Sequence, residues 1–157
     1  MKKFGIILLA ALFSACDSNK VFEENIAIEN HIWNLENNPK FQVEIMDTTS
    51  EMNLMVNVRH SAHYPFSNLW VFVNTTNPEG VTSTDTLECV LAAKDGKWLG
   101  SGLGDIWDIQ IPLKTQLFNS PGDYVFEIEQ AMRYGDQARI EQLPEIMDIG
   151  LRIELKK

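Results

Sequence analysis

The sequence predicts an all-β protein, a single β-sandwich-like domain of about seven to eight mostly antiparallel strands, behind an N-terminal lipoprotein signal peptide. Three observations support this. From residue 41 onward, apolar and polar residues alternate in one run after another, the pattern of half-buried strands. Clusters of turn formers, such as Asn-Ser-Pro-Gly-Asp at 119–123, separate the runs. No stretch has the period of a long amphipathic helix.

The N-terminus has the three regions of a secretory signal. Met-Lys-Lys precedes an apolar run at 4–13, which is too short for a membrane span of about 20 residues. The sequence FSAC at 13–16 resembles a lipobox, with Phe13 where leucine is usual. We therefore expect a cleaved signal peptide at 1–15, a lipidated tether at 16–20 beginning at Cys16, and one domain at 21–157. The alternative is ordinary secretion with a coincidental cysteine.

Charge and cysteine content restrict the classes of partner and compartment. The formal net charge of the 157 residues is −9, and cleavage would remove Lys2 and Lys3 as well. This acidity argues against nucleic acid and against anionic lipid surfaces as partners. Cys16 and Cys89 are the two cysteines. With Cys16 acylated, no disulfide framework is possible, and we expect Cys89 to be a small buried hydrophobe rather than a reactive thiol.

The predicted elements follow in chain order. Residues 21–34 hold either an edge strand or a short helix, and Asn-Asn-Pro at 37–39 marks a turn. Residues 137–143 are expected to form one or two helical turns. Alternation predicts strands at 41–47, 51–60, 68–76, 86–92, 109–113, 124–132 and 146–155.

A glycine-rich stretch, GKWLGSGLGDIWD at 96–108, is the first candidate site. It lacks the ending of a Walker loop and the spacing of a dinucleotide fingerprint. Its glycines therefore indicate a shaped connection between strands. Asp105 and Asp108 are three apart and would point to opposite faces of a strand, which disfavours a catalytic acid pair. Trp98 and Trp107 are residue types that also anchor protein partners.

Histidines and arginines give weaker signals. His60 and His63 are three apart, and no third metal ligand is evident, so we expect no metal site. No nucleophile elbow supports a serine triad. Arg133 and Arg152 lie among acidic residues, and the simplest interpretation is that both form surface ion pairs.

Several longer segments resemble one family, the gliding-motility lipoproteins of the GldH type. The most specific are YPFSNLW, DTLEC, GKWLGSGLGDIWD, FEIEQAMR and LPEIMDIGLRIE, and the likeness runs from Cys16 to the carboxyl end. The resemblance implies an envelope lipoprotein, in the outer membrane by preference, that works with other lipoproteins of a gliding apparatus coupled to type IX secretion. It implies no catalytic residue, metal or cofactor. The functional position it carries over is the lipid-bearing Cys16.

These observations lead to two hypotheses. The first is a non-enzymatic lipoprotein of the gliding and secretion machinery with a partner-binding surface. The residues assigned to that surface are Tyr64, Trp70, Trp98, Asp105, Ile106 and Trp107. The alternative for these residues is a structural role at the corners of the sandwich. The alternative is a ligand-binding or hydrolytic envelope protein that acts on glycan or peptidoglycan. An aromatic-floored pocket shared by Asp105 and Asp108 would favour the alternative.

Overall fold

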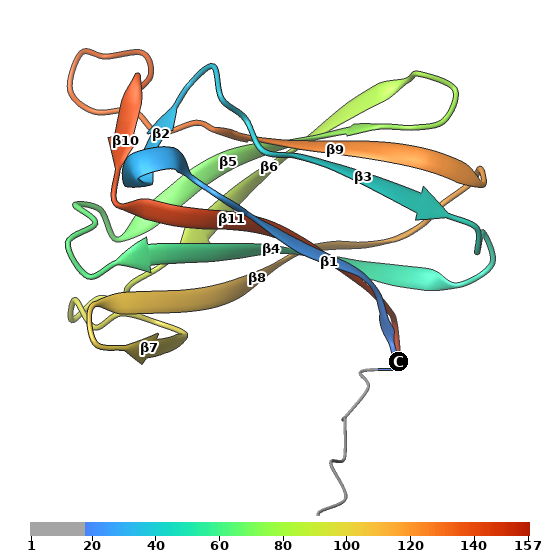
Figure 1. The fold of residues 1–157 in the computed structure, drawn as a ribbon, viewed down its shortest axis with the longest axis horizontal. Coiled ribbons are helices and arrows are strands. Elements are labelled where there is room, and N and C mark those ends of the chain that lie inside the picture. Colours follow the sequence, from blue (N-terminus) through green and yellow to red (C-terminus); the bar gives the residue numbers. More distant parts are fainter. Residues whose placement is uncertain (1–17) are drawn as a thin grey trace, which may run out of the picture.

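The computed structural model describes residues 18–157, which form two antiparallel sheets packed face to face and a third, two-stranded sheet at one end (Figure 1). The predicted signal peptide and Cys16 lie outside these residues. Strands dominate the described chain, and a single 3₁₀ turn interrupts them. The all-β, sandwich-like prediction is confirmed.

The larger sheet has the strand order β1-β11-β4-β8-β7, and each neighbouring pair is antiparallel. Its strands are β1 (Lys20–Ala27), β4 (Glu51–Ser61), β7 (Ser101–Leu103), β8 (Ile106–Leu117) and β11 (Ile146–Leu155). The first and last long strands of the described chain are therefore neighbours in this sheet. One edge is β1, and the other is the short hairpin strand β7.

The smaller sheet has the order β3-β9-β5-β6 and is also antiparallel. Its strands are β3 (Lys40–Ile45), β5 (Asn68–Thr76), β6 (Thr82–Val90) and β9 (Gly122–Gln130). A two-stranded sheet pairs β2 (Ile32–Asn34) with β10 (Gln142–Pro144). The 3₁₀ turn η1 (Glu29–His31) links β1 to β2.

The core lies between the two main sheets and follows from the period-two pattern. On β4, Leu54, Val56 and Val58 are buried, and on β5 alternate residues from Leu69 to Val73 are buried. All of them belong to one hydrophobic cluster. Burial of such side chains stabilises a fold by roughly 25 cal/mol for each Å² of apolar surface removed from water. This periodicity is why each of the seven predicted strands corresponds to a strand here.

Two uncertain segments are now placed. Residues 21–34 form an edge strand, then the 3₁₀ turn, then β2. The helical turns expected at 137–143 were wrong, because this segment is an irregular loop that leads into β10. Side-chain hydrogen bonds to backbone, such as Gln130 to the Ile140 carbonyl oxygen at 2.6 Å, hold the loop in place of a helix ladder. β2, β7 and β10 were missed because three residues are too few to show alternation.

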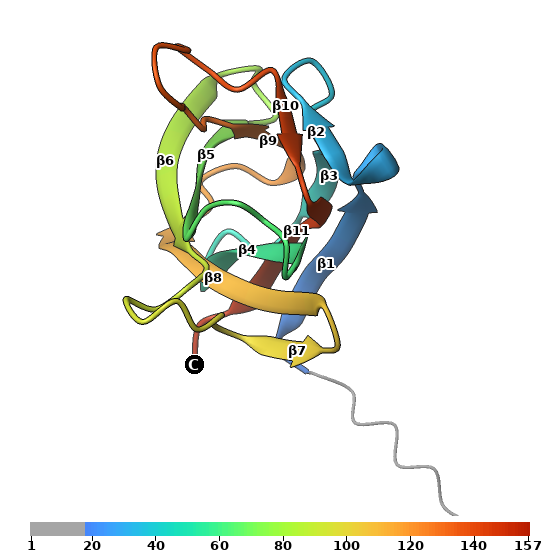
Figure 2. The same ribbon diagram turned by 90° about the vertical axis from the view of Figure 1, so that its left-hand side faces the viewer.

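The two ends of the sandwich differ in what they carry. The described chain enters beside the C-terminus, where the Leu155 amide donates to the Asn19 carbonyl oxygen at 2.8 Å. The opposite end, here called the distal end, carries the loops at 61–67, 91–106 and 131–141 (Figures 1 and 2). Figure 2 looks onto this distal end. No helix within residues 18–157 has the length and apolarity to cross a bilayer.

Candidate functional site

A series of aromatic rings runs through the distal end, from the core to the surface. The ring of Trp98 lies 4.6 Å from that of His60, and His60 lies 5.8 Å from Tyr64. The series continues from Tyr64 to Phe66 at 5.6 Å and from Phe66 to Tyr134 at 6.0 Å. The last two contacts are edge-on, a favoured arrangement of ring quadrupoles. Segments distant in the sequence are thereby joined into one packed unit.

The inner members of this series support the surface and do not form it. Tyr64 is 4% exposed, and its hydroxyl donates to the Asn68 carbonyl oxygen at 3.1 Å. Burial raises the pKa of the Tyr64 hydroxyl far above its ordinary value. Trp98 is partly buried and packs against the core. Of the six residues assigned to a partner surface, these two therefore lie beneath it.

The outer members line a pocket on the outer face of the smaller sheet, with a volume of about 620 Å³. We call it the aromatic pocket. Its lining residues are Phe66, Asn68, Trp70, Phe72, Thr86, Ala131, Met132, Arg133 and Tyr134. Trp70 is 38% exposed and Tyr134 is 70% exposed. Exposed rings in a concavity of this size are typical of binding sites.

Backbone and side-chain hydrogen bonds fix the wall of the aromatic pocket. Beyond β9 the chain stays beside β5, because the Ala131 amide donates to the Trp70 carbonyl oxygen at 2.8 Å. The Trp70 amide donates to the Met132 sulfur at 3.2 Å. Gln130 is fully buried and accepts from the Met132 amide at 3.0 Å while it donates to Ile140. One side chain thus ties both ends of the loop at 131–140.

Within the described chain, the acidic side chains near the aromatic pocket have partners but one arginine does not. Glu129 pairs with Arg139 at 2.6 Å, and Glu88 accepts from the Asn68 amide at 2.7 Å. Arg133 is exposed at the pocket wall and makes no ion pair with any residue of the described chain. The expectation of a surface ion pair was wrong for Arg133. Its guanidinium is left available beside an apolar pocket.

The other assigned residues, Asp105, Ile106 and Trp107, belong to the β7–β8 hairpin and do not line the aromatic pocket. Asp105 is exposed in the turn, and its carbonyl oxygen accepts from the Ala62 amide at 2.7 Å. Ile106 is 39% exposed and borders a separate shallow hollow with Leu103. The structure therefore places the six residues in three locations: the packed interior, the lining of the aromatic pocket and the β7–β8 hairpin.

The glycines of this hairpin have structural roles, as their pattern indicated. Gly100 has a φ of +85°, and a Cβ there would lie 2.2 Å from the Asp108 carbonyl oxygen. At Gly102 a Cβ would lie 2.7 Å from the ring of Trp107. Both positions exclude a side chain, so Trp107 packs over the hairpin backbone itself.

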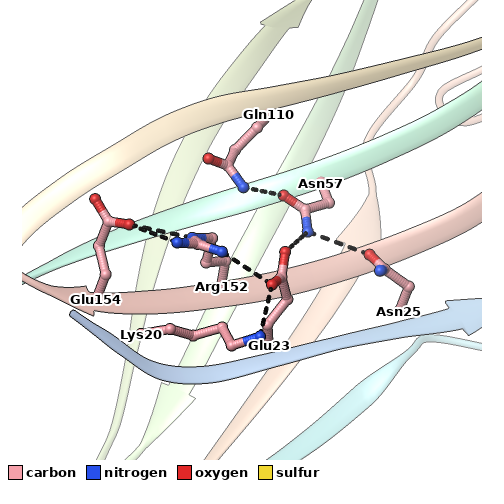
Figure 3. A network of polar contacts seen from close by, with 7 residues as sticks. All are labelled: Lys20, Glu23, Asn25, Asn57, Gln110, Arg152 and Glu154. Atoms are coloured by element: carbon pink, nitrogen blue, oxygen red, sulfur yellow. Dashed lines mark hydrogen bonds and ion pairs between the residues drawn. The ribbon is translucent and has the colours of Figure 1, made fainter. Parts of the chain in front are cut away.

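Paired polar groups cover the outer face of the larger sheet, which we call the polar face (Figure 3). Arg152 binds Glu23 at 2.9 Å and Glu154 at 3.0 Å, so its predicted ion pairing is confirmed. The Asn57 amide donates to Asn25 at 3.2 Å, and Gln110 donates to Asn57 at 2.9 Å. Figure 3 shows these groups bonding to one another across neighbouring strands.

Asp108 lies on the polar face and is ion-paired there. Its carboxylate binds the Arg59 guanidinium at 2.7 Å, and Arg59 also reaches Asp148 at 3.3 Å. Asp105 lies in the hairpin turn and does not line the hollow that contains Asp108. The two aspartates do not share an aromatic-floored pocket, so the stated condition for a carboxylate pair is not met.

A histidine and a cysteine, residue types that are often catalytic, are buried in the core. His60 is fully buried, with Nδ1 at 2.9 Å from the Ser61 carbonyl oxygen, and burial lowers its pKa below 6.5. Burial raises the pKa of the Cys89 thiol to about 12, and its prediction as a buried hydrophobe is confirmed. Among residues 18–157, no cluster of three or more histidine, cysteine or acidic side chains is placed to hold a metal.

Sequence reasoning missed most of the aromatic pocket. Phe72 was expected only as part of an alternating strand, and Met132 and Arg133 only as parts of a strand end. The available signal was the joint presence of aromatic residues in SAHYPFSNLW and AMRYGD, two turn-flanked segments. Their pairing across β5 and β9 depends on tertiary structure.

Comparisons with known proteins agree over nearly the whole chain. A family model described as GldH lipoprotein matches residues 20–153. The chain is 37% identical over 158 residues to the gliding motility lipoprotein GldH of Flavobacterium johnsoniae, covering 99% of this chain and 98% of that one. It is 35% identical over 153 residues to a gliding motility lipoprotein GldH homolog of Christiangramia forsetii, covering 96% and 93%.

Proposed function

The chain belongs to the GldH lipoprotein family, and from this premise we propose that it is a non-enzymatic envelope lipoprotein of the gliding-motility and type IX secretion machinery. It acts as a component or an assembly factor, anchored in the outer membrane by lipid on Cys16. Residues 1–15 are the cleaved signal, 16–20 the tether and 21–157 the working domain. The relatives' names support the lipoprotein and motility parts of this proposal.

The observation that carries the proposal is the position of the aromatic pocket relative to the tether. Cys16 precedes Lys20 by four residues, a span of at most about 14 Å when extended. The end that holds Lys20 and the C-terminus therefore stays close to the lipid. β4 has 11 residues, so the distal end lies roughly 35 Å further along the strands. The aromatic pocket, on the outer face of the smaller sheet toward the distal end, is thus on the part of the domain that can reach furthest from the lipid.

Three features support a binding role over catalysis. Asp108 is neutralised by Arg59 and lies apart from the aromatic pocket. His60 and Cys89, which are common catalytic residue types, are fully buried and do not line the aromatic pocket, and burial raises the pKa of the Cys89 thiol. The family description and the relatives' names state no catalytic activity.

The alternative, a protein that binds or hydrolyses glycan or peptidoglycan, has one observation in its favour. The volume of the aromatic pocket lies within the usual range of small-ligand sites, about 300–1,000 Å³. Its lining contains no acidic residue, so an acid–base pair for glycoside hydrolysis is lacking there. The structure therefore favours glycan binding over glycan hydrolysis within this alternative.

The test is a clean deletion in the source organism, scored by surface spreading and by the profile of secreted proteins. We expect both to fail, and we expect the wild-type gene to restore them while Cys16→Ser does not. Membrane fractionation of each strain gives the location of the protein. A deletion strain that spreads and secretes normally would exclude this role in that organism.

A further inference from the structure

We propose that the aromatic pocket binds a peptide segment of a partner protein that inserts an aromatic side chain and sets a carboxylate against Arg133. This inference rests on the proposed function, because it names the chemistry of the partner for the same surface. It adds a ligand class and a specificity-determining residue, Arg133.

The pocket lining selects an apolar group. Four rings, Phe66, Trp70, Phe72 and Tyr134, surround it together with Met132. An aromatic side chain that enters a protein site buries about 150–250 Å² and gains further from edge-on ring contacts. Thioether sulfur adds favourable contact with ring edges. A pocket of about 620 Å³ has room for such a side chain and part of the backbone that carries it.

The polar groups in the lining favour a carboxylate over a glycan. The side-chain amide of Asn68 already donates to Glu88, and the backbone carbonyl oxygen of Asn68 accepts from the Tyr64 hydroxyl. The open polar groups in the lining are the hydroxyls of Thr86 and Tyr134, the Trp70 indole N–H and the Arg133 guanidinium, and of these only Arg133 is charged. A sugar needs many donors and acceptors for its hydroxyls, whereas a carboxylate needs one guanidinium fork.

Arg133 differs from the other arginines of the described chain. Arg59, Arg139 and Arg152 each bind at least one carboxylate. Arg133 binds none within residues 18–157, although the protein has a net charge of −9. Guanidinium binds carboxylate in a two-pronged geometry that gives specificity as well as affinity. The complementary charge is therefore expected on the partner.

The aromatic pocket is formed without a ligand, which reduces the entropic cost of binding. Gln130 ties both ends of the loop at 131–140, and the Ile140 amide donates to the Met132 carbonyl oxygen at 2.9 Å. Phe66 supports the ring of Tyr134 from below at 6.0 Å. Arg133 therefore follows directly on Met132, which is 4% exposed and hydrogen-bonded through its amide to Gln130.

A matched pair of probes tests the inference: N-acetyl-L-phenylalanine, which has a carboxylate, and N-acetyl-L-phenylalaninamide, which does not. Each is titrated into the ¹⁵N-labelled full chain, processed at Cys16 and held in detergent micelles, and the backbone amide resonances of Asn68 and Ala131 in the pocket lining are followed. We expect the acid to bind at least about tenfold more tightly than the amide. Arg133→Gln should remove this difference, and Trp70→Ala should weaken both probes.

The control is Lys94→Gln, an exposed lysine with no ion pair among the described residues, which should change neither affinity. Equal affinity of the two probes for the wild type would overturn the inference. So would a response to oligomers of N-acetylglucosamine with no response to either probe, which would favour a glycan site.

The deletion strain separates the two failures. If the probes fail but the deletion abolishes spreading or secretion, the ligand chemistry is wrong and the proposed function stands. If the probes bind as expected but the deletion strain behaves normally, the peptide site stands and its assignment to this machinery is wrong.

Discussion

The polar face and the aromatic pocket occupy the outer surfaces of the two sheets, and they differ in whether their arginines are ion-paired. On the polar face, Arg152 and Arg59 each bind two carboxylates. At the aromatic pocket, Arg133 has no such partner in the described chain, and Tyr134 is 70% exposed. A surface whose polar groups satisfy one another stabilises the fold. A surface with unsatisfied groups beside exposed rings is suited to binding another molecule.

The largest effect on stability is expected from Gln130→Ala. The substitution leaves the Met132 amide and the Ile140 carbonyl oxygen without their buried partner. Each buried unsatisfied group costs about 1–3 kcal/mol, so the free energy of unfolding should fall by about 2–6 kcal/mol for the two groups. Chemical denaturation measures this. An unchanged midpoint would show that the loop at 131–140 is not held as described, and the pocket would lose its fixed wall.

A smaller loss of stability is expected from Arg152→Gln on the polar face. The Arg152 side chain is 14% exposed, and its loss removes the ion pair with Glu154 and leaves Glu23 with Lys20 as its cationic partner. Partly buried pairs with two partners contribute about 1–2 kcal/mol, more than isolated surface pairs. Spreading and secretion should be retained, because the polar groups of this face bond to one another within the chain and are not assigned to a partner. If a destabilised Arg152→Gln protein still complements the deletion, the polar face has a structural role only. If it fails to complement at normal protein levels, the polar face is also needed for function.

The inner end of the aromatic series is sensitive to acid through His60. Burial lowers the pKa of His60 below 6.5, so the folded chain binds fewer protons than the unfolded chain. The free energy of unfolding therefore falls as the pH drops through 6.5, by at most about 1.4 kcal/mol per unit, and levels off below the folded-state pKa. Denaturation of wild type and His60→Gln between about pH 8 and pH 5 isolates this part. Parallel curves for the two proteins would rule it out.

The smallest change in stability is expected from Arg133→Gln. The residue is exposed and forms no ion pair among residues 18–157, so unfolding should shift by less than about 0.5 kcal/mol. The preference for the carboxylate probe and complementation should nevertheless be lost. A thermal melt paired with the complementation assay distinguishes the two. A large loss of stability would mean that Arg133 supports the fold.

The fold could be predicted because its evidence is local. Alternating residues such as Val56 and Val58 report directly which face of a strand is buried. The hairpin glycines were also interpretable, since Gly100 needs a positive φ. The candidate site was less accessible, because its parts come from β5, from the loop before it and from the loop after β9. Trp70, assigned to a partner surface, lies in the lining of the aromatic pocket, while the buried Tyr64 was indistinguishable in sequence from an exposed ring.

The arginines show the limit most clearly. Arg133 and Arg152 both stand among acidic residues in the sequence, and the same surface ion pairs were expected for both. Strand pairing of β11 with β1 places Glu23 beside Arg152, whereas the turn after β9 carries Arg133 out to the wall of the aromatic pocket. Whether an arginine forms an ion pair therefore depends on the register of the strands and the path of the loops. The residues near it in the sequence do not reveal either.

The most direct test of the account is complementation of the deletion strain by the double variant Arg133→Gln/Tyr134→Ala, with Arg152→Gln as the matched change on the polar face. Protein levels and unfolding curves are measured for both. We expect the double variant to be folded and abundant but to fail to restore spreading or secretion, while Arg152→Gln restores them despite its lower stability. Full restoration by the double variant would contradict the assignment of the aromatic pocket as the working surface.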